Sequence, residues 1–292
     1  MPRHFLEVDD LTAAELVSVL DLAELLEVPQ VLIGQGVALL FEKPSARTRN
    51  SSEMAVVQLG GHPVTLRNEE VGIDTRETAE DLVRTLACYH SAVAARVFDH
   101  RHLVRMAAVS PVPVINLLSD AAHPCQALAD LLTLRQRWGL LAGKRVAWVG
   151  DGNNVCRSLA AAGHLAGIEV RVATPKGYEP PADTIERCAV VTHDPAEAVE
   201  GADAIVTDVW TSMGQESEVA ARVSDFAGFT VDEALMARAA SDAVFLHCLP
   251  AHRGDEVTAE VIDGPQSLVW LEAANRMHAM RGLLLFLFGE MA

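Results

Sequence analysis

A dense group of polar residues follows the first strongly apolar run of this chain. The segment FEKPSARTR at positions 41–49 places Ser45, Arg47, Thr48 and Arg49 directly after VALLF. A helix N-terminus presents free N–H groups and the positive end of the helix dipole, and both attract phosphate. Guanidinium groups and hydroxyls add charge-assisted hydrogen bonds. The segment therefore predicts a phosphate cradle, with an ordinary helix cap and solvated arginines as the alternative.

Two more polar groups follow apolar runs in the first half of the chain. SAVAARV (91–97) delivers Arg96, and VPVINLL (112–118) leads into AHPCQ with His123 and Gln126. A histidine in this place could donate a hydrogen bond to a carbonyl oxygen and stabilise it as it becomes an oxyanion. The alternatives are a surface ion pair for Arg96 and a structural role for His123.

The second half of the chain repeats this arrangement with different residue types. DGNN follows RVAWVG, and TDVWTSMG contains Asp208 and Ser212. Asn153 and Asn154 offer donors and acceptors suited to an amino-acid carboxylate. Asp208 could hold a substrate ammonium, with an ordinary aspartate at the start of a turn as the alternative. GDGNNV places valine where a dinucleotide-binding GxGxxG motif has its third glycine, and the strand EVRVATP does not end in an acidic residue. These departures argue against an NAD-dependent oxidoreductase.

His247 and Cys248 form a pair that allows several interpretations. They could be part of a metal site, a nucleophilic thiol beside a histidine, or a passively buried thiol. Adjacent residues of a strand face opposite sides, so we expect these two not to share a metal. The residues themselves leave a polar contribution to the site and passive packing both open, with no metal and no cofactor expected.

These segments require a scaffold of alternating strands and helices. Helical patterns separate eight short apolar runs, which we interpret as strands: 37–41, 91–97, 112–118, 145–150, 169–175, 204–209, 243–248 and 267–272. This alternation predicts an α/β fold with mostly parallel sheets flanked by helices. Ligands of such sheets bind beyond the carboxyl ends of the strands, where the polar groups lie.

The length of 292 residues suits two domains. The break is predicted near 139–143, where a long helical pattern ends in glycine and a new strand begins. We expect a first domain over 1–138, a second over 139–271, and a C-terminal helix over 272–292 that packs on the first domain. The active site is expected in the cleft between the two domains.

Composition limits the compartment and the partners. The net charge of −17 argues against nucleic acid or an anionic membrane as a partner. No apolar stretch is long enough to span a bilayer, and the N-terminus does not resemble a signal peptide. Five scattered cysteines without CxxC spacing argue against a disulfide framework. The expectation is a reduced, cytoplasmic protein.

Taken together and in this order, the motifs resemble those of the aspartate/ornithine carbamoyltransferase family. FEKPSARTR resembles the S-T-R-T-R phosphate motif of the family, and HPCQ resembles its H-P-x-Q. DGNN, DVWTSMG and HCLPAHRGDEV resemble the second-domain motifs of the ornithine branch, and EAANRMHAMRGLL resembles its closing helix.

The resemblance implies transfer of the carbamoyl group of carbamoyl phosphate to the δ-amine of L-ornithine, giving L-citrulline and phosphate. It implies a carbamoyl-phosphate site on the first domain and the last helix, comprising Ser45, Ala46, Arg47, Thr48, Arg96, His123, Gln126 and Arg276, joined from the second domain by Cys248 and Leu249. It implies an ornithine site in the second domain, comprising Asn154, Asp208, Ser212 and Met213. Cys248 and Leu249 are expected beside the reacting amine, with Arg96, His123 and Cys248 acting in catalysis. Members of the family are commonly homotrimers with sites near the protomer interfaces, so a homotrimer is expected.

The chain departs from the family pattern in three places. Ala46 stands where the phosphate motif has threonine, the next helix continues as NSSEMA, and the segment 67–77 does not have the typical spacing of its loop. Two alternatives remain open: a carbamoyltransferase for another amine, such as putrescine or an N-acyl-ornithine, and a non-catalytic phosphate-binding relative.

Overall fold

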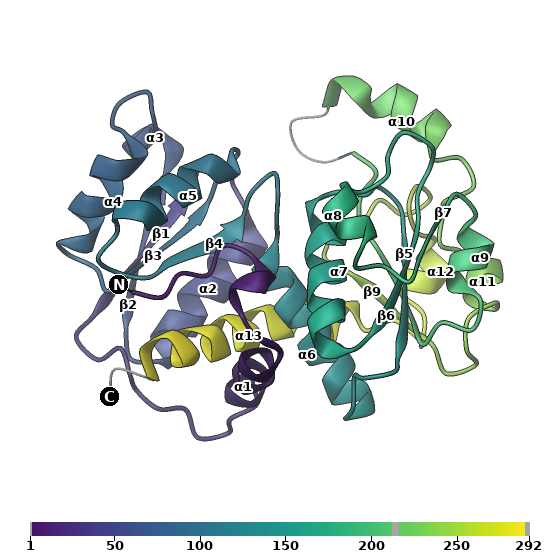
Figure 1. Cartoon of the computed structure of the whole chain (residues 1–292), viewed down its shortest axis with the longest axis horizontal. Coiled ribbons are helices and arrows are strands. Elements are labelled where there is room, and N and C mark those ends of the chain that lie inside the picture. Colours follow the sequence, from purple (N-terminus) through teal and green to yellow (C-terminus); the bar gives the residue numbers. More distant parts are fainter. Residues whose placement is uncertain (1, 212–215, 290–292) are drawn as a thin grey trace. The chain divides into compact units, whose positions relative to one another are not determined.

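The chain folds into two compact units in the computed structural model, which describes residues 2–211 and 216–289 (Figure 1). One unit comprises Met1–Leu132 and Ala274–Ala292, and the other comprises Thr133–Ala273. Two helices, α6 (Pro124–Trp138) and α13 (Val269–Gly289), contribute residues to both units. No helix within the described residues is long and apolar enough to cross a membrane.

The first unit is built on a four-stranded parallel sheet in the order β2-β1-β3-β4. Its strands are β1 (Gly36–Phe41), β2 (His62–Arg67), β3 (Ala92–Arg96) and β4 (Val114–Leu118). Its helices, besides α6 and α13, are η1 (Val8–Asp10), α1 (Ala13–Ala23), α2 (Ala46–Gln58), α3 (Asn68–Val71), α4 (Ala79–Ala87) and α5 (His100–Val109).

Both faces of this sheet are covered, which explains why β1 is apolar throughout. Side chains alternate between the two faces of a strand. Ala38 and Leu40 of β1 accordingly pack with Val83 of α4 and Met106 of α5 in one core cluster. The residues between them along β1, such as Leu39, are equally buried and face the other side.

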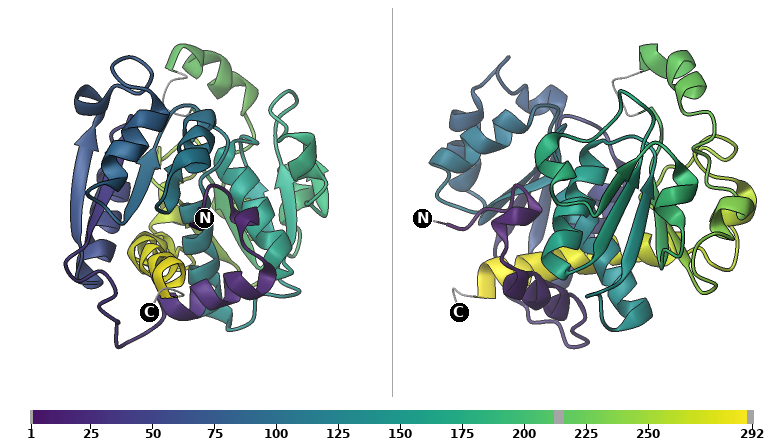
Figure 2. Two further views of the ribbon diagram at one scale, coloured as in Figure 1. Left: turned by 60° about the vertical axis from the view of Figure 1, so that its left-hand side comes forward. Right: turned by 45° about the vertical axis from the view of Figure 1, so that its right-hand side comes forward.

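The last helix, α13, packs closely on α1 within the first unit (Figures 1 and 2). A Cβ atom added at Gly282 would lie 2.5 Å from the carbonyl oxygen of Val19, so only glycine permits this approach. The neighbouring Arg281 donates a 2.7 Å hydrogen bond from Nη2 to the carbonyl oxygen of Ala23, the last residue of α1. The closing helix therefore also satisfies a backbone acceptor at the end of the first.

The second unit is built on a five-stranded parallel sheet in the order β7-β6-β5-β8-β9. Its strands are β5 (Arg145–Val149), β6 (Glu169–Ala173), β7 (Val190–Thr192), β8 (Ala204–Thr207) and β9 (Val244–His247). Its helices are α7 (Asn154–Ala166), α8 (Ala182–Ile185), α9 (Pro195–Val199), η2 (Glu216–Glu218), α10 (Val219–Asp225), α11 (Glu233–Met236) and α12 (Ala259–Ile262).

The core of the second unit combines alternate strand residues with helical ones. Ala147 of β5, Ile205 of β8 and Phe245 of β9 form a buried cluster with aliphatic and aromatic side chains of the covering helices. In α7, a Cβ atom added at Gly163 would lie 2.4 Å from Cγ2 of Val170, so glycine allows this helix to approach β6.

The predicted α/β fold with two parallel sheets is confirmed, but three details of the strand prediction were wrong. The segment 267–272 was expected to be a strand, whereas α13 already begins at Val269; a short apolar run does not distinguish a strand from the start of a helix. The strands β2 and β7 were not predicted. Both lie at sheet edges and are only partly buried, which weakens their apolar signal.

Candidate active site

In the first unit, the predicted site residues follow the two strands at which the strand order reverses. The sheet runs from β1 to β2 in one direction and from β1 to β3 and β4 in the other, so the switch point lies between β1 and β3. Ligands of open parallel sheets bind at such points, beyond the carboxyl ends of the strands. The segment 41–49 follows β1, and Arg96 is the last residue of β3.

The polar segment after β1 begins α2, as predicted from the sequence. Ser45 is the N-cap residue, and its hydroxyl accepts a 3.3 Å hydrogen bond from the backbone N–H of Thr48. Ala46 is the first helical residue and is exposed. The helix therefore presents its first N–H groups at the edge of the sheet, where an anion is favoured.

Two buried arginines converge on the Thr48 side chain. Nη1 of Arg96 and Nη2 of Arg276 each donate a 3.3 Å hydrogen bond to Oγ1 of Thr48, which the Ser45 hydroxyl also contacts at 3.1 Å. A hydroxyl oxygen has two lone pairs, so these donors exceed what it can accept. A register shift between Ala95 and Arg96 in the β3–β4 pairing accompanies this arrangement, and such irregularities redirect side chains.

His123 and Gln126 lie at the start of α6 and are both buried. Burial, followed by the positive charges of Arg276, Arg96 and Arg47, lowers the pKa of His123 well below its usual value. The ring is therefore neutral near neutral pH and can donate one hydrogen bond. Nη1 of Arg276 donates to Oε1 of Gln126, whose amide group donates to the buried Asp130 at 2.8 Å.

The remaining arginines of the 41–49 segment differ from one another. Within residues 2–211 and 216–289, the Arg47 side chain makes no hydrogen bond or ion pair and is exposed. Arg49 instead pairs with Glu53 at 2.8 Å. A cavity of about 390 Å³ opens beside this helix start; its lining includes Ser45, Ala46 and Arg49.

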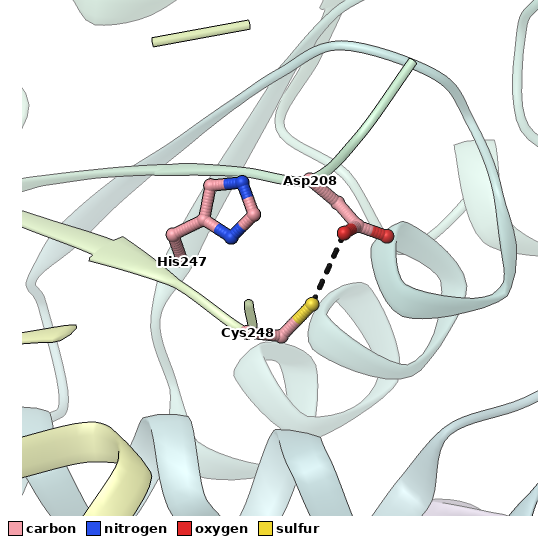
Figure 3. Close-up of side chains that lie close together, drawn as sticks. All are labelled: Asp208, His247 and Cys248. Atoms are coloured by element: carbon pink, nitrogen blue, oxygen red, sulfur yellow. Dashed lines mark hydrogen bonds between the residues drawn. The ribbon is translucent and has the colours of Figure 1, made fainter. Parts of the chain in front are cut away.

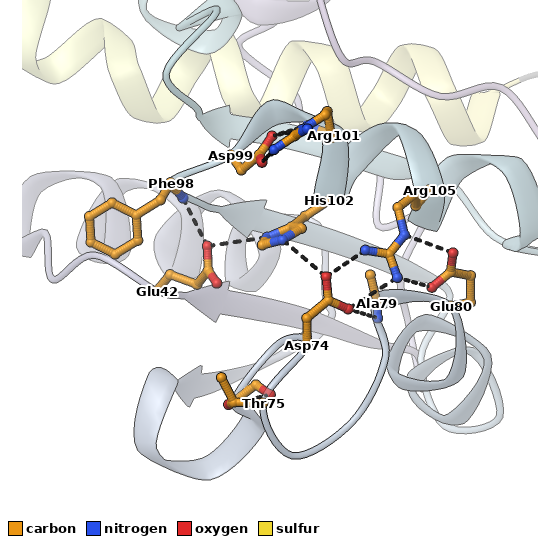
Figure 4. Close-up of polar contacts among 11 residues, drawn as sticks. Glu42, Asp74, Thr75, Ala79, Glu80, Phe98, Asp99, Arg101, His102 and Arg105 are labelled. Carbon is orange, nitrogen blue, oxygen red and sulfur yellow. Dashed lines mark hydrogen bonds and ion pairs between the residues drawn. The ribbon is translucent and has the colours of Figure 1, made fainter.

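The atypical segment 67–77 is held in place by a network of charged side chains (Figure 4). Asp74 accepts a 2.5 Å hydrogen bond from Arg105 of α5, which also binds Glu80. His102 of the same helix lies 3.4 Å from Asp74 and 3.7 Å from Glu42, the residue that follows β1. The network therefore ties this segment to the polar turn at the switch point.

In the second unit, predicted residues again follow the strands at a switch point, here between β5 and β8. DGNN follows β5 and leads into α7, which has Asn153 as N-cap and Asn154 as its first residue. Asn153 accepts hydrogen bonds from the N–H groups of Val155 at 2.9 Å and Cys156 at 3.1 Å. Its amide group donates to Oδ2 of Asp208 at 3.1 Å.

Asp208 and Cys248 form a direct contact at the carboxyl ends of β8 and β9 (Figure 3). The Cys248 thiol donates a 3.1 Å hydrogen bond to Oδ1 of Asp208. Asp208 is largely buried and Cys248 is half-buried. By contrast, burial raises the pKa of the Cys125 thiol to about 12, and that of Cys156 is also raised well above its usual value. Those two thiols are suited to packing.

The expectation that His247 and Cys248 do not share a metal stays a prediction, but the reason given for it, that they face opposite sides of a strand, does not hold. Ligand atoms of Asp208, His247 and Cys248 all lie within 4.8 Å of one another. Cys248 follows the last residue of β9, so strand alternation no longer applies to it. Both ring nitrogens of His247 already have partners, because Nδ1 accepts from the Leu249 N–H at 2.8 Å and Nε2 lies 3.1 Å from Glu256.

The second glycine of GDGNN has a structural role in this unit. A Cβ atom added at Gly152 would lie 2.3 Å from the backbone nitrogen of Pro180, and Gly152 N–H donates to the Tyr178 carbonyl at 2.9 Å. In dinucleotide-binding folds the corresponding glycine lets the pyrophosphate approach. In this chain the approaching group is the protein's own backbone, which weakens the NAD interpretation further.

The structure thus groups the predicted residues into two clusters. Those of the first unit are Ser45, Ala46, Arg47, Thr48, Arg96, His123, Gln126 and Arg276. Those of the second unit are Asn154, Asp208, Cys248 and Leu249. Ser212 and Met213 lie outside the described residues. The sequence prediction omitted two polar partners: Asp130 and Glu256. Their only sequence signal was closeness to the HPCQ and HCLP motifs.

Comparison with known proteins gives the class to which this fold and these clusters belong. The family model for the carbamoyl-P binding domain of aspartate/ornithine carbamoyltransferases matches residues 3–136, and the model for the Asp/Orn binding domain matches residues 142–287. The chain belongs to the aspartate/ornithine carbamoyltransferase family.

Several relatives that the chain matches over nearly its full length are ornithine carbamoyltransferases. The chain is 51% identical to an ornithine carbamoyltransferase of Acidothermus cellulolyticus, with 98% of this chain and 97% of the relative covered. A solved structure of ornithine carbamoyltransferase from Pyrococcus furiosus superimposes with a TM-score of 0.95 at 43% identity, covering 99% of this chain and 97% of that one. The solved structure of ornithine carbamoyltransferase from Thermus thermophilus superimposes with a TM-score of 0.92 at 48% identity, covering 99% of each chain.

Proposed function

We propose that this protein is an ornithine carbamoyltransferase, which transfers the carbamoyl group of carbamoyl phosphate to the δ-amine of L-ornithine. The observation that carries the proposal is the convergence of Arg96 and Arg276 on Thr48 at the start of α2. It concentrates positive charge and surplus donors at a helix N-terminus, as a phosphate ester requires. The full-length similarity to ornithine carbamoyltransferases supports the same conclusion.

In this proposal the first unit binds carbamoyl phosphate. Ser45, Arg47, Thr48 and the backbone N–H of Ala46 hold the phosphate together with Arg96. The neutral ring of His123 and the groups of Gln126 and Arg276 bind the carbamoyl portion. When the amine attacks, negative charge develops on the carbamoyl oxygen, and a neutral imidazole N–H beside two guanidinium groups can stabilise it.

The second unit holds the acceptor in this proposal. Asn154, with Ser212 and Met213, binds the amino-acid end of ornithine, while the Asp208 carboxylate orients the reacting amine. Cys248 and Leu249 lie beside that amine, with Cys248 hydrogen-bonded to Asp208. The amine nitrogen forms a bond to the carbamoyl carbon, the bond to the phosphate oxygen breaks, and the departing phosphate accepts the amine proton. This sequence requires positioning of two substrates and forms no covalent bond to the enzyme.

A citrulline assay with carbamoyl phosphate and L-ornithine tests the proposal. We expect turnover with L-ornithine and little with putrescine or N-acetyl-L-ornithine at the same concentration. Preference for one of the other amines would reassign the acceptor, and inactivity with every amine would favour a non-catalytic phosphate-binding relative. We also propose a homotrimer, as expected from the family resemblance, and light scattering coupled to size exclusion would measure its mass.

A further inference from the structure

The turn that carries Cys248 and Leu249 is held by the residue that precedes it. Leu249 has a backbone φ of 59°, a value that non-glycine residues rarely adopt because of steric crowding. Its N–H donates a 2.8 Å hydrogen bond to Nδ1 of His247, two residues earlier. The imidazole therefore closes the turn at the point where the backbone is least favourable.

This hydrogen bond determines the proton position on the His247 ring. A backbone N–H can only donate, so Nδ1 must present its lone pair and the proton of the neutral ring lies on Nε2. Nε2 lies 3.1 Å from Oε1 of Glu256 and donates to it. The two side chains are completely buried, so solvent cannot substitute for either partner.

Glu256 also fixes the far side of the same loop. Its Oε1 accepts a 2.6 Å hydrogen bond from the backbone N–H of His252. The backbone N–H of His247 donates at 2.9 Å to Oε2 of Glu272, a second buried carboxylate. His247 is thus held through its ring and through its main chain, while the next residue, Cys248, contacts Asp208.

We propose that His247 and Glu256 are positioning residues for carbamoyl transfer: the imidazole holds the Leu249 N–H through Nδ1, and the carboxylate holds the imidazole through Nε2. Neither side chain is proposed to touch substrate. Their effect is to keep the Cys248 thiol on Asp208 and the Leu249 backbone in its unusual conformation. The inference rests on the proposed function, because it names the residues that prepare the acceptor side of that reaction.

Two substitutions of His247 separate the roles of its nitrogens. His247→Asn retains an oxygen near the position of Nδ1, so it can still accept from the Leu249 N–H but loses the bond to Glu256. His247→Gln retains a donor near the position of Nε2 and loses the acceptor for Leu249. Both replace a buried imidazole with a smaller amide, so a general packing defect would affect them alike.

We expect kcat for citrulline formation to be about tenfold higher in His247→Asn than in His247→Gln, since misplacement of reacting groups is costly. The KM for carbamoyl phosphate should stay within about twofold of wild type in both, because the proposed ligands of its phosphate group all lie in the first unit. Glu256→Leu should lower kcat, and Glu256→Gln, which keeps an acceptor oxygen, should restore most of it. His164→Asn is the matched control: its side chain is exposed on α7, and kcat should remain that of wild type.

A second measurement does not depend on turnover. The rate at which iodoacetamide alkylates Cys248, followed by mass spectrometry of the peptide, should differ between His247→Gln and wild type by about threefold or more, with His247→Asn close to wild type. Equal kcat losses in the Asn and Gln variants that parallel their melting temperatures, with equal alkylation rates, would overturn the proposal. If the wild-type protein forms no product with any amine, the proposed function fails, and the alkylation contrast still tests the positioning role.

Discussion

The Cys248 thiol donates a 3.1 Å hydrogen bond to the Asp208 carboxylate, joining the ends of two neighbouring strands forty residues apart in sequence. Cys248 is the half-buried thiol that contacts a carboxylate of the proposed acceptor site, whereas Cys125 and Cys156 are buried thiols with raised pKa values. This contact makes Asp208 and Cys248 a unit whose two members should be tested together.

Removing either member should slow catalysis more than it weakens carbamoyl phosphate binding. Asp208→Asn should lower kcat by about 100-fold and Cys248→Ala by about tenfold, because the reacting amine loses its orienting groups. Steady-state citrulline assays measure both effects, and the exposed Cys88 provides the control Cys88→Ala. A Cys248→Ser variant with wild-type turnover would show that the thiol itself is dispensable.

Adding a hydroxyl at the start of α2 should strengthen phosphate binding. Ala46 is the first helical residue and is exposed, so Ala46→Thr can place a donor at the helix N-terminus without disturbing the core. A hydrogen bond to a charged group should lower the KM for carbamoyl phosphate by about tenfold. Met54→Thr, an exposed position of the same helix, controls for the lower helix propensity of threonine. Unchanged affinity would mean that position 46 contributes through its backbone N–H alone.

The ring of His123 should remain neutral well below its usual titration range. Burial and the charges of Arg276, Arg96 and Arg47 lower its pKa from 6.5. The unfolded chain therefore binds this proton at a higher pH than the folded chain, so acidification below about pH 6.5 destabilises the protein through this group. NMR titration of labelled histidine should find the pKa of His123 depressed in wild type and higher in Arg276→Met. An equal pKa in the two proteins would exclude Arg276 as a cause.

The network around Arg105 should stabilise the protein at neutral pH and not in acid. Hydrogen bonds from Arg105 lower the pKa values of Asp74 and Glu80 below 3.8 and 4.5. The stability that these hydrogen bonds contribute is thus fully present above the ordinary pKa values of the two carboxyl groups. It is lost as the pH falls through their folded-state pKa values. Arg105→Gln should lower the melting temperature at pH 7, and the difference should shrink near pH 3.

Arg101→Gln is the matched control for this network. Arg101 is strongly exposed and pairs with Asp99 two residues away, so it links no separate segments. Because exposed local ion pairs contribute little to stability, the melting temperature of Arg101→Gln should match that of wild type at both pH values. If Arg105→Gln lowers the melting temperature equally at both pH values, the cause would instead be the lost packing of the arginine side chain.

Most strands and the site motifs could be predicted from the sequence, because both depend on residues that are close together along the chain. Buried parallel strands produce short apolar runs such as VALLF, and polar residues after them mark the strand ends. The strands β2 and β7 were not predicted, because edge strands are only partly buried and their apolar pattern is weak. The start of α13 was predicted to be a strand, because a short apolar run is compatible with either structure.

The sequence alone determined the alternation of strands and helices, the polar turn at the start of α2 and the family resemblance, because each is expressed in residues that are neighbours along the chain. Only the tertiary structure decided which distant groups meet. It shows that Arg276 is hydrogen-bonded to Thr48 and Gln126. It likewise shows the hydrogen bonds of Asn153 to Asp208 and of His247 to Glu256. Such contacts depend on strand order and on the directions of side chains, and neither follows from spacing in the sequence.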